Sequence, residues 1–138
     1  VKWNKQVVVI NCKSSSEGQK TEKFIYLQNQ TAEEIAELMQ NSEFGIFPAS
    51  TVAIEACAVR LPFICGYFVD NQKHIYNGIA KNNLAVCVGD LNKFRGTQLR
   101  DAIKIISLKN RYESIIKQQK AFMDNQTGKR LLKIFQEL

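Results

Sequence analysis

Two short apolar runs, separated by a helix-length segment, constrain the fold of this chain most strongly. The runs cover residues 44–47 and 62–65, and the segment between them covers residues 52–60. Short continuous apolar runs are typical of buried parallel strands, and parallel strands need a crossover, which is usually a helix. The sequence therefore predicts a strand–helix–strand unit with its polar turns at one edge of a sheet.

Ser50 and Thr51 follow the first apolar run and begin the predicted helix. The first amide groups of a helix have no partner within it, and the helix dipole adds partial positive charge there. This position favours an anion, and phosphate is the natural ligand. We therefore predict an anion site at Ser50 and Thr51.

Glu55 lies four residues after Thr51, so the two side chains share one face of the helix. Residues 52–54 and 56–59 around it are apolar or small on every side, which is typical of a buried helix. A buried carboxylate needs a partner, because burying it alone is costly. A ribose diol could supply two hydroxyl donors; alternatively, Glu55 faces solvent or pairs with Arg60 or a lysine.

The order of these residues resembles the C-terminal half of GT-B nucleotide-sugar enzymes. The shared pattern is a small residue with Ser50 and Thr51, then Glu55, a Leu-Pro pair before an apolar strand, and Asp-Asn-Gln at 70–72. The pattern is most similar to the PseG-type UDP-sugar hydrolases of pseudaminic acid synthesis, and more distantly to MurG-type N-acetylglucosaminyltransferases. The likeness covers most of the chain, since residues 36–43 resemble the family's preceding helix and residues 124–130 its C-terminal segment.

The resemblance implies a role for each matching residue. Ser50 and Thr51 would hold the diphosphate, Glu55 the uridine ribose, and Asn71 and Gln72 the sugar or its distal phosphate. The catalytic base of PseG-type enzymes lies in the N-terminal domain, so no catalytic residue is expected here. The family usually has glycine immediately before Ser-Thr; this chain has Ala49, whose methyl group is expected to narrow the backbone approach to phosphate.

Further strands are predicted at residues 7–10, 24–27 and 84–88. Five strands alternating with helices predict an α/β fold, a Rossmann-like doubly wound parallel sheet with right-handed crossovers. A GT-B C-terminal half usually starts with one more strand and a Gly-rich loop. We therefore expect residues 1–138 to form a single nucleotide-sugar-binding domain, truncated at its N-terminus and belonging to a longer two-domain enzyme.

Two helix starts are predicted from capping residues. Thr31 and Glu34 have the spacing of a capping box. Asp70 or Asn71 is expected to cap a helix ending near residue 81. That cap would bring Asn71 and Gln72 to the same edge of the sheet as Ser50 and Thr51; the alternative is that Asn71 only caps and Gln72 is solvated. The single histidine has no Ser, Cys or acid at triad spacing and is not expected to be catalytic.

Composition narrows the class of protein. The chain is 45% hydrophobic and 23% charged, which fits one globular domain with a proper core. The net charge of +6 comes from lysines and arginines spread along the chain without interleaved aromatics, so nucleic acid is not the expected partner. Basic charge of this kind suits a solvated face, an anionic sugar nucleotide or a membrane surface.

The four cysteines, Cys12, Cys57, Cys65 and Cys87, show no Cys-x-x-Cys spacing, and three lie in apolar runs. Metal and redox roles are therefore not expected, and no cofactor is predicted. The cysteines are typical of core positions in a reduced compartment. No stretch approaches the length of a membrane span and no signal-peptide pattern opens the chain, so the expected location is the cytoplasm.

The final predicted helix carries Leu131, Leu132, Phe135 and Leu138 on one side. In GT-B proteins the C-terminal helix commonly crosses to the N-terminal domain. We therefore expect an exposed apolar patch here, or a dimer formed through it.

The leading functional hypothesis is the UDP-sugar-binding half of a PseG-like hydrolase, acting in surface polysaccharide or nonulosonic acid biosynthesis. One alternative is a GT-B glycosyltransferase, in which a sugar acceptor replaces water. A further alternative is a non-catalytic α/β interaction module whose turn at Ser50 and Thr51 binds nothing.

Overall fold

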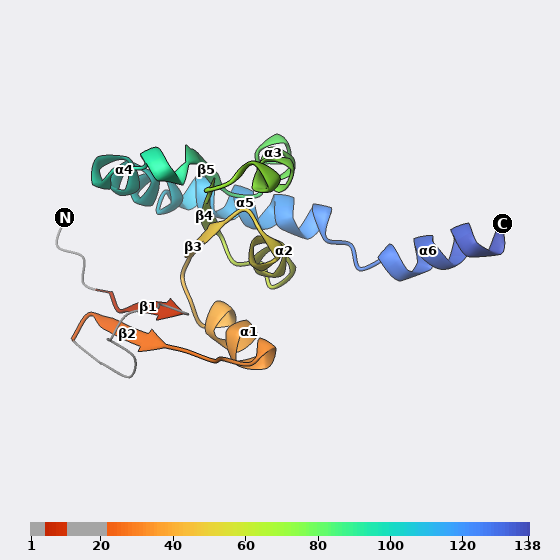
Figure 1. Ribbon diagram of the computed structural model, residues 1–138, viewed down its shortest axis with the longest axis horizontal. Coiled ribbons are helices and arrows are strands. Elements are labelled where there is room, and N and C mark those ends of the chain that lie inside the picture. Colours follow the sequence, from red (N-terminus) through yellow and green to blue (C-terminus); the bar gives the residue numbers. More distant parts are fainter. Residues whose placement is uncertain (1–4, 11–21) are drawn as a thin grey trace. The chain divides into compact units, whose positions relative to one another are not determined.

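The structure, a computed structural model, describes residues 5–10 and 22–138. It divides into two compact units, residues 1–37 and 38–138, which are considered separately below (Figure 1). Cys12 lies outside the described residues.

The first unit contains a parallel strand pair and the start of a helix. Strand β1 (Val7–Ile10) pairs with β2 (Phe24–Leu27) from Val7 opposite Phe24 onward. Helix α1 (Ala32–Gln40) begins after Thr31 and crosses the boundary between the units. The predicted capping box is confirmed, because Thr31 N donates to Glu34 Oε2 at 2.8 Å and Glu34 N donates to Thr31 Oγ1 at 3.2 Å.

The second unit is built on a parallel sheet of three strands in the order β3-β4-β5. Its strands are β3 (Gly45–Pro48), β4 (Phe63–Tyr67) and β5 (Val86–Asp90). The connections are α2 (Thr51–Ala58) and then η1 (Asp70–Gln72) with α3 (Lys73–Lys81). After β5 come η2 (Leu91–Lys93), α4 (Gly96–Ile106), α5 (Lys109–Phe122) and α6 (Thr127–Gln136).

Helices cover both faces of this sheet. Ile64 and Val86 on one face form a buried cluster with Ala102 and Ile106 of α4 and Ile115 of α5. On the other face, α2 packs against β3 and β4, and α3 packs against β4 and β5. Residues 63–66 of β4 are all buried, as expected for the central strand of a parallel sheet covered on both sides.

The α/β class with parallel strands is confirmed, but the strands form two sheets where the sequence predicted one. In the described residues β1 and β2 pair with each other, and β3 begins a separate sheet. The physical reason is that apolar patterns encode strands locally, whereas the hydrogen bonds that join strands into one sheet depend on neighbours distant in sequence.

A buried glutamine links α5 to the sheet. The Nε2 of Gln119 donates to the carbonyl oxygens of Leu61 and Leu84, both at 2.9 Å. These carbonyls precede β4 and β5, so one side chain ties α5 to the entry points of two strands. Gln119 is completely buried, and its Oε1 has no hydrogen-bond partner in the described residues.

The described cysteines confirm the expectation of core positions at two of three sites. Cys57 and Cys65 are buried, Cys87 is partly exposed, and all three are free thiols. Burial raises the pKa of Cys57 to about 11 and that of Cys65 to about 12.

We predict that Cys57 and Cys65 resist alkylation at pH 8 in the folded protein. The thiolate is the nucleophile, and raising a thiol pKa from 9 to about 11 leaves about one hundredth as much thiolate at that pH. Iodoacetamide labelling followed by peptide mass spectrometry measures the rate at each cysteine. Both should react at the rate of a free cysteine in urea; rapid labelling of Cys65 without denaturant would contradict the buried placement.

No helix in the described parts of the chain combines the length and apolar character needed to cross a bilayer.

Candidate functional site

The carboxyl ends of β3, β4 and β5 form one edge of the three-stranded sheet. Pro48 lies opposite Gly66, and Tyr67 lies opposite Asp90. The chain leaves this edge through three turns, at Ser50, at residues 68–72 and at η2. Open parallel α/β sheets bind ligands at this edge, so these turns form the candidate site.

Ser50 and Thr51 lie at the start of α2, as predicted. Ser50 occupies the N-cap position with extended backbone, but its side chain makes no capping hydrogen bond. Its Oγ lies 3.5 Å from the carbonyl oxygen of Pro48. Among the described residues, the backbone N–H groups of Thr51 and Val52 have no acceptor. Two amides, the Thr51 hydroxyl and the helix dipole are therefore available to an anion, and the Ser50 hydroxyl would have to leave its long contact with Pro48 O to join them.

Ala49 does not obstruct this turn as its sequence position suggested. The residue is completely buried, and its N–H donates to Gly66 O at 2.7 Å. Its φ is not among the positive values of the chain, so the position does not require glycine. Because the methyl group lies inside the protein, it does not face a ligand approaching Ser50.

Glu55 is exposed, and the prediction that α2 is buried on every side is wrong. Only Ala53, Ala56 and Cys57 of this helix are buried, because the helix packs one face against the sheet and α5. Thr51 and Glu55 lie on the exposed face. Of the alternatives considered for Glu55, the one in which it faces solvent is correct.

Arg60, the other partner considered for Glu55, is used elsewhere. Its guanidinium donates to the carbonyl oxygens of Cys57 at 2.7 Å and Ala58 at 3.1 Å, and to Met123 O at 3.0 Å. In the part of the chain described, the Glu55 carboxylate makes no hydrogen bond or ion pair. It is therefore free to bind a ligand hydroxyl. Because the carboxylate is exposed to water, the fold does not require it to have a partner.

The turn after β4 differs from the prediction. Neither Asp70 nor Asn71 caps α3, because a 3-10 turn, η1, occupies residues 70–72 and places Gln72 at the N-cap position. Asp70 pairs instead with Lys73 at 2.8 Å, and this contact lowers the pKa of the Asp70 carboxyl. The Lys73 ammonium also lies 5.5 Å from the centre of the Tyr67 ring.

Asn71 and Gln72, the two predicted sugar-binding residues, have different surroundings. Asn71 is exposed, and its amide makes no hydrogen bond within the described residues. Gln72 Oε1 accepts from Phe68 N at 2.8 Å, so part of this amide is already used to hold its own turn. No hydrogen bond or ion pair of the described residues joins either one to Ser50, Thr51 or Glu55.

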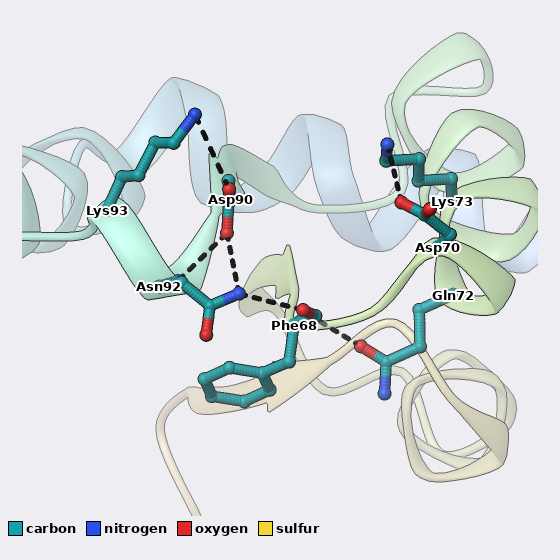
Figure 2. A network of polar contacts seen from close by, with 7 residues as sticks. All are labelled: Phe68, Asp70, Gln72, Lys73, Asp90, Asn92 and Lys93. Atoms are coloured by element: carbon teal, nitrogen blue, oxygen red, sulfur yellow. Dashed lines mark hydrogen bonds and ion pairs between the residues drawn. The ribbon is translucent and has the colours of Figure 1, made fainter.

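The sequence analysis missed a second group of polar residues at this edge, in the turn after β5. Asn92 Nδ2 donates to Phe68 O at 2.7 Å and to Asp90 Oδ1 at 3.0 Å (Figure 2). Asp90 Oδ1 also accepts from Asn92 N at 2.9 Å. Lys93 Nζ lies 3.9 Å from Asp90 Oδ2. The signal was present as an Asp followed two residues later by Asn, directly after an apolar strand.

Together these contacts fix the backbone of Phe68 from both sides. Its N–H is held by Gln72 and its carbonyl by Asn92 (Figure 2). Its ring stays half-exposed and lines a cavity of about 320 Å³ beside the carboxyl edge. The other lining residues are also apolar: Ile46, Phe47, Pro48, Leu91, Phe94 and Leu99.

Gly66 of β4 occupies a position with no room for a larger residue. A Cβ there would lie 2.5 Å from the side chain of Leu91 and 2.8 Å from Gly89 O. The close approach of β4 to the turn after β5 therefore depends on glycine.

The edge thus combines free amide donors, hydroxyls and an exposed carboxylate with a half-exposed aromatic ring on a fixed backbone and an apolar cavity. Such a surface can bind an anionic group and an adjoining apolar or planar group. The residues gathered here include no nucleophile paired with a base. His74 is exposed on α3, and no group of three or more potential metal-ligating side chains occurs among the described residues.

Comparison of the chain with protein-family models, with curated proteins and with solved structures finds no match.

Proposed function

We propose that this chain binds a UDP-sugar at the carboxyl edge of the β3-β4-β5 sheet. The observation that carries the proposal is the turn at Ser50 and Thr51, where two unpaired amides and the Thr51 hydroxyl meet the positive end of α2. A diphosphate suits this turn, because two adjacent anionic groups can accept hydrogen bonds from it. Exposed Glu55, on the same helix face as Thr51, supplies an acceptor for ribose hydroxyls.

The proposed parent reaction is hydrolysis of a nucleotide sugar, in the manner of the PseG-type enzymes that the motif resembles. Water would replace UDP at the anomeric carbon, and the amides at Ser50 and Thr51 would stabilise the charge of the departing diphosphate. The base that activates water is assigned to a further domain of the parent enzyme. We place the reaction in the cytoplasm, in keeping with the free thiols of Cys57, Cys65 and Cys87.

Asn71 and Gln72 contribute unequally to the proposed site. Asn71 is free to bind the sugar or its phosphate. Gln72 can offer its amide nitrogen while its oxygen holds Phe68 N. We expect Asn71→Ala to weaken binding of a UDP-sugar without changing the turn. Gln72→Ala should weaken binding and also release the backbone of Phe68, because it removes the hydrogen bond to Phe68 N.

An NMR titration of the chain with UDP, with UMP and ADP as comparison ligands, tests the proposal. We expect UDP to shift the amide signals of Ser50, Thr51 and Glu55 selectively, and Ser50→Ala with Thr51→Ala to weaken binding by about tenfold, equivalent to about 1.4 kcal/mol in hydrogen bonds to charged oxygens. A parallel titration with inorganic pyrophosphate, which has no ribose, tests Glu55. Glu55→Gln should reduce the preference for UDP over pyrophosphate, because the neutral amide is a weaker acceptor for the ribose hydroxyls.

The chain offers matched controls for these variants. Thr97→Ala removes an exposed hydroxyl at the start of α4, and Glu113→Gln removes an exposed carboxylate on α5. Neither should change UDP binding. If millimolar UDP shifts no signal at the α2 turn, the chain is better described as an α/β interaction module. If UDP binds but the control variants weaken binding equally, the site does not lie at the α2 turn.

A further inference from the structure

Helix α6 exposes its whole apolar side. Its large apolar side chains are all half or more exposed, from 50% at Leu131 to 70% at Phe135, and no residue of the helix is buried. An exposed patch on this helix was predicted from the sequence and is confirmed. The structure adds one residue to it, Ile134.

Polar and apolar residues of α6 separate cleanly around the helix. With about 100° between successive residues, the apolar residues fall on one side of the helix and the polar residues on the other. The apolar side consists of Leu131, Leu132, Ile134 and Phe135, and Leu138 lies just beyond the end of the helix. The polar side consists of Lys129, Arg130, Lys133 and Gln136, and Glu137 follows at the C-cap.

Lysines and arginines are spread along the whole chain, but acids are few near its C-terminus, so most of the net charge arises there. Residues 109–138 hold seven lysines and arginines against three acids, so they contribute +4 of the net +6. On α6 itself, Arg130 pairs with Asp124, and Lys133 lies 3.7 Å from Glu137. Lys129 at the start of the helix, and Lys117 and Lys120 on α5, are exposed and have no acidic partner in the described residues.

We infer that α6 docks on an anionic lipid surface, with its apolar side in the interface and its cations toward the headgroups. A helix with a clean apolar side and lysines on its polar side is the form that lies in the membrane interface. Its ten residues extend about 15 Å, far short of a bilayer crossing, so the helix would lie flat.

Charge complementarity favours this occupant over a second copy of the chain. Two copies joined through α6 would bring two positively charged segments together, and like charges oppose such pairing. An anionic membrane instead attracts each cation near its surface, and each lysine or arginine there raises binding about fivefold.

The test is sedimentation of the whole chain with two kinds of lipid vesicle. One kind is phosphatidylcholine alone, and the other contains about 30% phosphatidylglycerol, whose negative charge gives the vesicle a surface potential. We expect the anionic vesicles to bind the chain at least about tenfold more tightly, because two or more lysines contribute. Salt at about 0.5 M should remove most of this difference, because it screens surface charge.

Phe135→Glu and Gln136→Glu form a matched pair of variants, since both add one negative charge to neighbouring exposed positions of α6. Phe135→Glu should lower vesicle binding by at least about tenfold, because it removes apolar contact and adds repulsion, whereas Gln136→Glu should lower it only by the charge contribution, about fivefold. Both positions are exposed, so circular dichroism should show both variants folded as wild type.

Three results would overturn the inference: equal binding to neutral and anionic vesicles, no binding to either, or equal losses in the two variants. Light scattering separates the two other occupants: a monomer that binds neither kind of vesicle would leave the apolar side of α6 to the N-terminal domain that the family resemblance expects it to reach. A dimer in solution that Phe135→Glu dissociates, without vesicle binding by the wild-type chain, would assign the apolar side of α6 to a second copy.

Discussion

Gln119→Ala is expected to lower the free energy of unfolding by about 2–5 kcal/mol, although the residue replaced is polar and lies in a polar stretch of sequence. The substitution removes both hydrogen bonds that Nε2 donates, to Leu61 O and Leu84 O. It leaves two buried carbonyls without a donor and opens a void between α5 and the sheet. Gln119→Leu should cost less, about 1–3 kcal/mol, because it fills the void and removes the unpaired Oε1.

Urea unfolding of the two variants and the wild type measures this order. Gln118→Ala is the matched control, because Gln118 is the neighbouring glutamine on the same helix and is exposed. It should change the free energy of unfolding by less than about 0.5 kcal/mol. Equal effects at positions 118 and 119 would contradict the buried bridge between α5 and the two strands.

Helix α5 shows why sequence patterns could not predict this bridge. The apolar residues Tyr112, Ile115, Ile116 and Phe122 suggest the buried side of the helix. In the structure Gln119, one turn after Ile115, takes the buried position, while Phe122 at the end of the helix is half-exposed. Gln118 and Gln119 cannot be distinguished by residue type. They differ only because Gln119 meets the carbonyls of Leu61 and Leu84 in the folded chain, whereas Gln118 is exposed.

Other elements could be predicted because they depend on residues close in sequence, unlike the bridge at Gln119. The capping box at Thr31 and Glu34 and the apolar run of β4 depend on residues close in sequence. The α2 helix was found, but its burial was overestimated. Small residues such as Ala58 are compatible with both core and surface, so their presence does not reveal how many sides are covered.

The candidate site also contains residues that local sequence predicts and residues that depend on distant contacts. Ser50 and Thr51 could be placed at a helix start from local pattern alone. Asn92 could not be connected to Phe68, because the contact spans 24 residues and depends on the neighbouring positions of β4 and β5. Asp70, expected to cap a helix, pairs instead with Lys73 three residues later, because the 3-10 turn at residues 70–72 places Gln72 at the N-cap of α3.

Phe63→Ala is expected to produce the largest loss of stability, about 3–5 kcal/mol in the free energy of unfolding. Phe63 is completely buried in the central strand β4, and its ring centre lies 5.7 Å from that of Phe47 on β3. Truncation removes this aromatic contact and leaves a void between the sheet and its helices. Because β4 pairs with both β3 and β5, neighbouring strands cannot close the void without losing register.

Phe122→Ala is the matched control, since it deletes the same side chain from a half-exposed position at the end of α5. We expect it to cost less than about 1 kcal/mol, because little apolar surface returns to water. Urea unfolding monitored by far-ultraviolet circular dichroism gives both values. If the two variants lose similar stability, then β4 is not the centre of the core.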